Sequence, residues 1–189
     1  MFIVNEIIVL LASNLILMQA LGTSTLFIAA GSRKQLLTTA GIITIFTTTG
    51  SAAAFVCDKI TGGEKVISLL MYTVSVGVLY MLLLSALYFF SRELFVKIRR
   101  YIHISAFNCA VMGTLFTISG KAAQDSALMH FGSYVGAGLQ TGAGFVIAAL
   151  ILSAAYGRLC SAEVPASFRG FPAMLIYLGI ISMAVYALS

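Results

Sequence analysis

The chain has 189 residues, of which 60% are hydrophobic and only 9% charged, and its mean hydropathy is +1.05. Soluble domains carry about 25% charged residues, so the composition excludes a soluble globular protein and indicates an integral membrane protein. The net charge of +5 does not indicate nucleic-acid binding, because the basic residues lie almost entirely in short segments between apolar runs, where they determine membrane topology.

Six apolar runs are close to or above the roughly 20 residues that cross a bilayer as a helix, and none alternates like a barrel strand. We therefore expect an all-α membrane protein with a single integral membrane domain over residues 1–189. The first run lacks the basic front and cleavage site of a secretory signal, so it is expected to be a retained span. The expected spans are Ile3–Ala30, Leu36–Val56, Val66–Phe90, Ile102–Ile118, Ala127–Tyr156 and Phe171–Leu188.

The first and fourth spans are interrupted by residues that weaken a helix. The first would be about 42 Å long as a straight helix, which is more than a bilayer core requires. A glycine and three hydroxyl residues lie in it at Leu21–Thr25 (LGTST). The fourth is interrupted at Phe107–Gly113 (FNCAVMG), where an asparagine and a cysteine lie side by side in an apolar run.

Each interrupted span opens a group of three, and an odd number of spans inverts the second group relative to the first. The sequence thus predicts six transmembrane helices as two inverted three-helix repeats, roughly 1–95 and 96–189, with the first and fourth helices broken. Such breaks point to a site near the bilayer midplane, because irregular backbone is tolerated in lipid only where protein or water covers it. The structural alternative is that Asn108 bonds a neighbouring helix and Gly22 permits close packing.

The basic residues predict the orientation of the chain. The odd-numbered connections between spans hold eight of the 11 basic residues, and the even-numbered connections hold the other three. The positive-inside rule then places the odd connections in the cytoplasm and both termini outside. The eight are Arg33, Lys34, Arg92, Lys97, Arg99, Arg100, Arg158 and Arg169, and the three are Lys59, Lys65 and Lys121.

Glycines in the fifth span predict a close helix contact, either within the chain or with another subunit. Two pairs have the small-xxx-small spacing that lets helix backbones approach each other. They are Gly132 with Gly136 and Gly138 with Gly142, and Gly144 and Ala148 extend the same surface.

Three segments together resemble one family. They are Ser13–Ser24 (SNLILMQALGTS), Phe107–Gly113 (FNCAVMG) and Glu163–Gly170 (EVPASFRG). The chain resembles the paired six-helix membrane subunits of the Rnf and Nqr ion-translocating electron transport complexes, and its C-terminal part looks closer to the RnfA and NqrE branch than to RnfE and NqrD. The resemblance covers the whole chain, and the Asn-Cys-Ala-Val-x-Gly run is its most specific motif.

The resemblance implies a partner and a cofactor. In that family two such subunits of opposite topology pack together, and each supplies one cysteine from each broken helix to a 2Fe-2S cluster inside the membrane. The cluster relays electrons in complexes that move Na⁺ or H⁺. Thiolates are the usual iron-sulfur ligands, and N–H groups at helix ends suit a negatively charged cluster. The cofactor-binding residues that the resemblance implies are Cys109 as the metal ligand, with Ser24, Asn108, Gly22, Thr23 and Thr25 around it.

One position departs from the family. Where the first break of these subunits reads Leu-Gly-x-Cys, this chain reads Leu21-Gly22-Thr23-Ser24, so the second thiolate is missing. A serine oxygen is a harder and, as a neutral alcohol, far weaker ligand than a thiolate. Three alternatives stay open: an alkoxide or water completes the shell of the iron, the partner supplies a substitute, or this branch has lost the cluster.

Other metal-ligating and acidic residues are expected near the ends of the spans. The three cysteines form no CxxC pair, and their odd number argues against a disulfide framework or a self-contained metal site. The two histidines lie toward opposite faces, so they cannot share a metal. The residues expected near span ends, in packing or surface roles, are Cys57, Cys160, His103, His130, Glu6 and Asp58.

The sequence supports three functions of different classes. The first is a membrane subunit of an Rnf- or Nqr-like respiratory complex in a bacterial or archaeal cytoplasmic (inner) membrane, beside a homologous six-helix subunit of opposite topology and other subunits of the complex. Such a subunit is not catalytic alone, since no nucleotide, flavin or haem motif is present. The second is a small inverted-repeat transporter, although charged midplane residues, which mark ion pathways, are missing. The third is a cofactor-free scaffold subunit.

Overall fold

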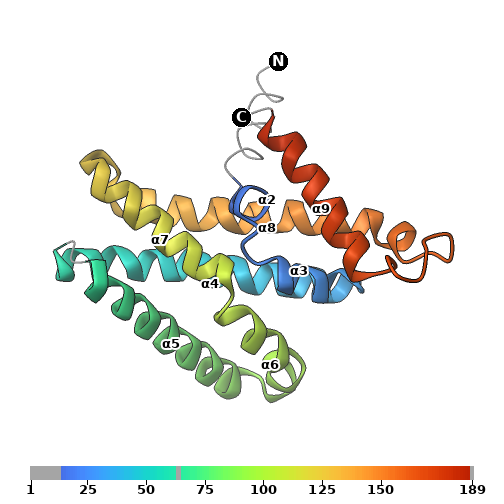
Figure 1. Ribbon diagram of the computed structural model, residues 1–189. Helices are drawn as coiled ribbons and strands as arrows, with labels where there is room; N and C mark the ends of the chain where they lie inside the picture. The colour runs from blue at the N-terminus through green and yellow to red at the C-terminus, as the bar shows by residue number, and fades with distance from the viewer. Residues whose placement is uncertain (1–13, 63–64, 188–189) are drawn as a thin grey trace.

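The computed structural model of the chain describes residues 14–62 and 65–187 (Figure 1). These residues form eight α-helices and one 3-10 turn, and they contain no strand. The elements are α2 (Leu15–Gln19), α3 (Thr23–Ala30), α4 (Arg33–Thr61), α5 (Lys65–Phe90), α6 (Arg92–Ala106), α7 (Cys109–Gln124), η1 (Ser126–Leu128), α8 (Phe131–Leu159) and α9 (Phe171–Tyr186).

Three of the described helices are long and apolar enough to cross a membrane, at Gln35–Thr61, Val66–Phe90 and Phe131–Leu159. Phe95–Ala106 and Cys109–Gln124 meet the same criterion as a pair that bends by 46°, which would make a fourth span. The all-helical, multi-pass character expected from the sequence therefore agrees with the structure. The count of six spans stays a prediction, since residues 3–13 of the first expected span and Leu188 of the last lie outside the described residues.

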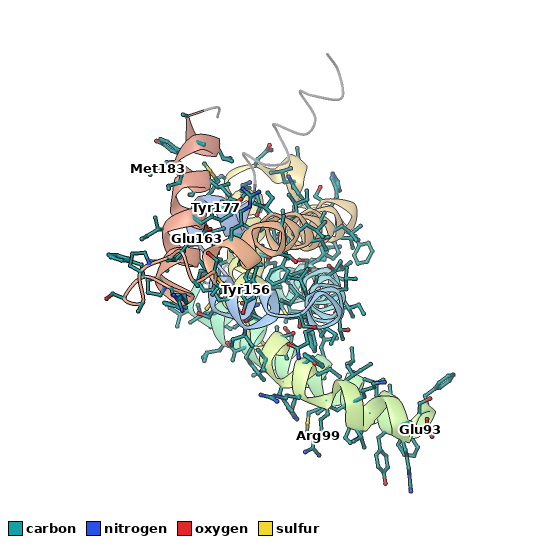
Figure 2. The ribbon with its side chains drawn as sticks, turned by 90° about the vertical axis from the view of Figure 1, so that its right-hand side faces the viewer. Glu93, Arg99, Tyr156, Glu163, Tyr177 and Met183 are labelled. Carbon is teal, nitrogen blue, oxygen red and sulfur yellow. The ribbon has the colours of Figure 1, made fainter. Side chains whose placement is uncertain are left out.

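Helix α6 differs from the expectation. Residues 92–101 were expected in a charged connection, and the fourth span was expected to begin at Ile102, yet the helix starts at Arg92. The segment is amphipathic: Arg99 and Arg100 are exposed, whereas Ile102 is fully buried. Its charged face lowers the average hydropathy, so an apolar-run criterion does not detect the helix. Figure 2 shows α6, with Glu93 and Arg99, extending away from the rest of the bundle.

Helices α4 and α8 lie side by side through the middle of the molecule (Figure 1) and make the most extensive helix contact among the described elements. Two apolar clusters form along them. One includes Ile43 and Phe145 and joins α4 and α8 to α2, α3 and α9. The other includes Phe46 and Tyr134 and joins α4 and α8 to α5, α6 and α7. The two middle helices are therefore shared by both cores.

The contacts between helices interleave the two halves of the sequence. In the first half, α2 contacts α9, the last helix of the second half. In the second half, α6 and α7 both contact α5, the last helix of the first half. A twofold relation between residues 1–95 and 96–189 would produce this pattern. The inverted repeat itself stays a prediction.

Glycines allow α8 to approach α4 closely. A Cβ atom at Gly138 would lie 2.6 Å from the carbonyl oxygen of Thr47, and one at Gly142 would also overlap α4. The packing role predicted for this second glycine pair is confirmed. Around Gly132 and Gly136, by contrast, no described atom lies within 4 Å of the position that a Cβ would take.

Threonines are tolerated in the apolar helix α4 because their hydroxyl groups bond to carbonyl groups of the same helix. Thr44 donates to Ala40 at 2.8 Å, and Thr48 donates to Thr44 at 2.7 Å. These bonds satisfy side chains that would otherwise be unpaired polar groups in lipid.

Candidate functional site at the two helix breaks

The first break separates α2 from α3. Ala20 and Gly22 both have left-handed backbone conformations, with φ of 55° and 81°, and this ends one helix and redirects the chain into the next. The hydroxyl of Thr23 donates to the Ala20 carbonyl at 3.1 Å, which satisfies one polar group at the break. The Asn14 side chain caps the start of α2 and donates to the Gly144 carbonyl of α8 at 2.9 Å, which ties the broken segment to the middle of the molecule.

The second break lies at Phe107 and Asn108, between α6 and α7. Asn108 is the N-cap of α7: its Oδ1 accepts a hydrogen bond from the Ala110 N–H at 3.1 Å. Asparagine is a preferred residue at this position because its side chain satisfies an N–H that the helix leaves free. The Asn108 side chain is buried, and its Nδ2 has no hydrogen-bond partner among the described residues. A buried donor of this kind is costly to leave unpaired, so it is available to a ligand.

The two breaks are in direct contact. A Cβ atom at Gly22 would lie 2.9 Å from the Ala110 methyl group and 3.1 Å from Asn108 Oδ1, so only glycine fits there without displacement. Leu21 packs directly against Gly113 on the first turns of α7. The segments Leu21–Thr25 and Phe107–Met112, which the sequence expected to meet, are therefore adjacent through Gly22, Ala110 and Asn108.

Ser24 and Cys109 both lie in the first turn of a helix that starts at a break. Cys109 is the first residue of α7, and its thiol is free and exposed. Ser24 is the second residue of α3 and is also exposed. Thr25, in contrast, is buried and lines a cavity of about 90 Å³ with Thr39 and Arg100, so it does not share the exposed surface of Ser24.

The chemistry that this arrangement offers is incomplete. The first turns of α3 and α7 present unpaired N–H groups, and Cys109 adds one thiol. The described residues contain no group of three His, Cys, Asp or Glu side chains that could hold a metal ion. A metal centre at this surface would therefore need ligands from outside the described part of the chain.

The other cysteines and histidines lie elsewhere, as the sequence expected. Cys57 is buried near the end of α4, and Cys160 is the C-cap of α8. His103 is paired with the hydroxyl of Tyr80 at 2.5 Å, and His130 is the N-cap of α8. Glu6 lies outside the described residues.

Sequence reasoning gave no role to Asp58, which the structure places in a polar cluster. The side chain is only 5% exposed, and the hydroxyls of Tyr72 and Tyr134 both donate to its carboxylate. The signal available in the sequence was an acidic residue in the last turn of an apolar helix, together with tyrosines near the starts of two other apolar helices. Nothing in the sequence paired them.

Comparison with known proteins supports the family resemblance. No family model matches the chain. Over 101 residues the chain is 34% identical to RnfA, one component of the ion-translocating oxidoreductase complex of Aromatoleum aromaticum. The matched region covers 52% of this chain and 48% of that protein, so the chain spans about half the length of the curated relative.

The name of the relative agrees with the RnfA and NqrE branch that the sequence motifs indicated. It describes one subunit of a multisubunit membrane complex that moves ions and catalyses redox chemistry. It names neither a cofactor nor a coupling ion.

Proposed function

We propose that this chain is a membrane subunit of an ion-translocating oxidoreductase complex and helps carry electrons across the membrane. The observation that carries the proposal is the contact between the two helix breaks, with the exposed Cys109 thiol in the first turn of α7. The similarity to RnfA of such a complex supports it. In this proposal the breaks form one side of a 2Fe-2S site, and a homologous six-helix subunit of opposite topology forms the other.

The residues at the breaks fit half of such a site. Cys109 offers the thiolate that iron-sulfur clusters require, and the N–H groups of two helix starts suit a negatively charged group. The unpartnered Nδ2 of Asn108 is a further donor at the same place. One thiol cannot hold two irons, so the remaining ligands come from the partner, with Ser24, a water molecule or a partner residue in the fourth position.

Each residue of the chain has a separate task in this proposal. Cys109 binds iron, while the α7 N–H groups and Asn108 stabilise the negative charge of the ligand sulfur. Gly22 holds the two breaks together because no side chain separates them. The cluster, when bound, supplies one-electron transfer. Coupling of that transfer to Na⁺ or H⁺ movement belongs to the assembled complex in a bacterial or archaeal cytoplasmic membrane.

The face of α5 is suited to contact lipid or a partner subunit. Most of its apolar side chains are exposed in the isolated chain, among them Leu70, Val74 and Met81 at 63%, 62% and 64%. Such a surface is not stable in water. We therefore expect the chain to be purified with other subunits of the complex, and a well-behaved isolated monomer retaining a bound cofactor would contradict the partner proposal.

The cluster is tested by measuring iron and labile sulfide in the purified complex and by electron paramagnetic resonance after reduction. Cys109→Ala should abolish the signal of this cluster, because it removes the single thiolate that the breaks provide. Cys160→Ala is the matched control and should leave the signal unchanged, since Cys160 lies at the end of α8.

Variants of Ser24 then identify the fourth ligand. If Ser24→Ala lowers cluster content as much as Cys109→Ala, the serine is a ligand. If it has no effect, water or the partner completes the shell. Ser24→Cys should strengthen the cluster if the geometry found in the family is retained. A complex that assembles fully and contains no iron attributable to Cys109 would contradict the proposal and favour a cofactor-free scaffold.

A further inference from the structure

One end of the molecule contains a buried carboxylate that the redox proposal does not use. Here α4 and α7 end, and α5 and α8 begin (Figure 1). Asp58 lies in the last turn of α4 and is only 5% exposed. A carboxylate removed from water needs compensating partners, so the groups around Asp58 determine what it can do.

The partners of Asp58 are neutral hydroxyl groups from three other helices. Tyr72 of α5 donates to Oδ1, and Tyr134 of α8 donates to Oδ2 at 2.6 Å. The hydroxyls of Tyr72 and Ser119 of α7 lie 2.7 Å apart. The two tyrosine side chains are completely or almost completely buried, at 1% and 0% exposure, which holds the hydroxyls in place. These groups share the charge of the carboxylate and do not cancel it.

The cluster borders a pocket of about 870 Å³. Asp58 is the one charged residue among those that line it, and the described lining includes no basic side chain. Gly62, Gln124 and Met129 line the pocket as well and are exposed, so it opens at the end of the bundle. The space is large enough for an ion and several water molecules.

A purely structural role would not require this arrangement. A neutral amide could link the same three helices through hydrogen bonds without removing a charge from water. An uncompensated acidic group, an adjacent set of hydroxyl oxygens and room for water together form a set of donors for a cation. Oxygen donors select hard cations, and a single carboxylate suits a monovalent ion better than a divalent one, whose sites carry more negative charge.

We propose that the Asp58 pocket binds an alkali-metal cation, with the carboxylate as its charged ligand and the hydroxyls of Tyr72, Tyr134 and Ser119 as neutral or positioning groups. The proposal goes beyond the redox function, because binding at this end of the bundle requires neither Cys109 nor a cluster. It locates a cation site where the even-numbered connections meet.

The test measures equilibrium binding of ²²Na⁺ to the purified complex in nanodiscs at constant ionic strength, with choline replacing Na⁺. The wild-type complex should bind Na⁺ saturably, and Li⁺ or K⁺ should compete. Asp58→Asn should remove one site per chain or weaken it at least tenfold, because it keeps the side-chain shape and removes the charge. Glu163→Gln, the same change at an exposed position beyond α8 (Figure 2), should leave binding unchanged.

A second pair of variants covers the case in which Asp58→Asn does not fold. Tyr134→Phe keeps the ring that packs edge-on against Phe55 at 5.4 Å and removes only the hydroxyl. It should weaken Na⁺ binding severalfold, whereas Tyr177→Phe, on α9 in the other core cluster, should not. Wild-type Na⁺ affinity in folded Asp58→Asn or Tyr134→Phe protein, or no saturable binding by the wild-type complex, would overturn the proposal. Because these measurements need no reduction, they stay informative if the iron-sulfur proposal fails.

Discussion

Gly22 is the residue on which the contact between the two helix breaks depends. It has a left-handed backbone conformation, with φ of 81°, and it lies against Ala110 and Asn108 with no space for a side chain. Both properties favour glycine independently, since an L-residue is strained at this φ and a methyl group would overlap the opposite helix. The residue therefore fixes both the direction of the chain and the distance between the breaks.

Replacement of Gly22 tests this assignment. Gly22→Ala should destabilise the protein by about 2 kcal/mol or more, from left-handed backbone strain and overpacking together. Thermal unfolding in detergent, followed by loss of the monodisperse peak in size-exclusion chromatography, should show a lower midpoint. Gly41→Ala is the matched control, because no described atom lies within 4 Å of the added methyl group. Its midpoint should equal or exceed that of the wild type, and equal midpoints for both variants would contradict the assignment.

At the residue scale, the sequence predicted what depends on neighbouring positions. Asparagine before a run of helix-forming residues is a local cap signal, and Asn108 does cap α7. The association of Asp58 with Tyr134 depends on the packing of α4 against α8, across 76 positions of the chain. No local pattern contains that information, so the polar cluster was found only in the structure.

At the element scale, long apolar helices were predictable and mixed ones were not. Helices α5 and α9 begin within one residue of their expected starts, because their apolar runs have clear ends. Helix α6 was missed, since one face carries the charges of Lys97 and Arg99 while the opposite face packs into the core. Average hydropathy combines the two faces, whereas a helical period separates them.

The glycines of α8 provide a prediction about a single helix contact. Gly138→Ala should destabilise the protein by about 1–3 kcal/mol, because the new methyl group would meet the backbone of α4, which cannot move away as a side chain can. Gly136→Ala, two residues earlier on the same helix, should be neutral because its surroundings are open. Thermal unfolding of the two variants under identical conditions makes the comparison. A neutral Gly138→Ala would mean that α4 and α8 are farther apart than described.

At the scale of the whole molecule, the two halves of the chain depend on each other for their cores. Each apolar cluster combines helices from residues 1–95 with helices from 96–189, so neither half has a core of its own. The sequence predicted two related halves from the positions of the breaks. It could not predict that they interleave, because the apolar faces of such helices do not specify which partner covers them.

The orientation of the molecule in the membrane gives the last prediction. The α4–α5 and α7–α8 connections lie at one end and the α3–α4 and α8–α9 connections at the other (Figure 1), so the structure separates the two sets that the distribution of basic residues distinguished. In sealed cells a membrane-impermeant maleimide should label Lys121→Cys from outside and should label Lys97→Cys and Arg158→Cys only after permeabilisation. All three positions are exposed, and the unsubstituted chain measures background labelling of its native cysteines. Labelling of Lys97→Cys from outside intact cells, with Lys121→Cys protected, would reverse the topology and place the Asp58 pocket on the cytoplasmic side.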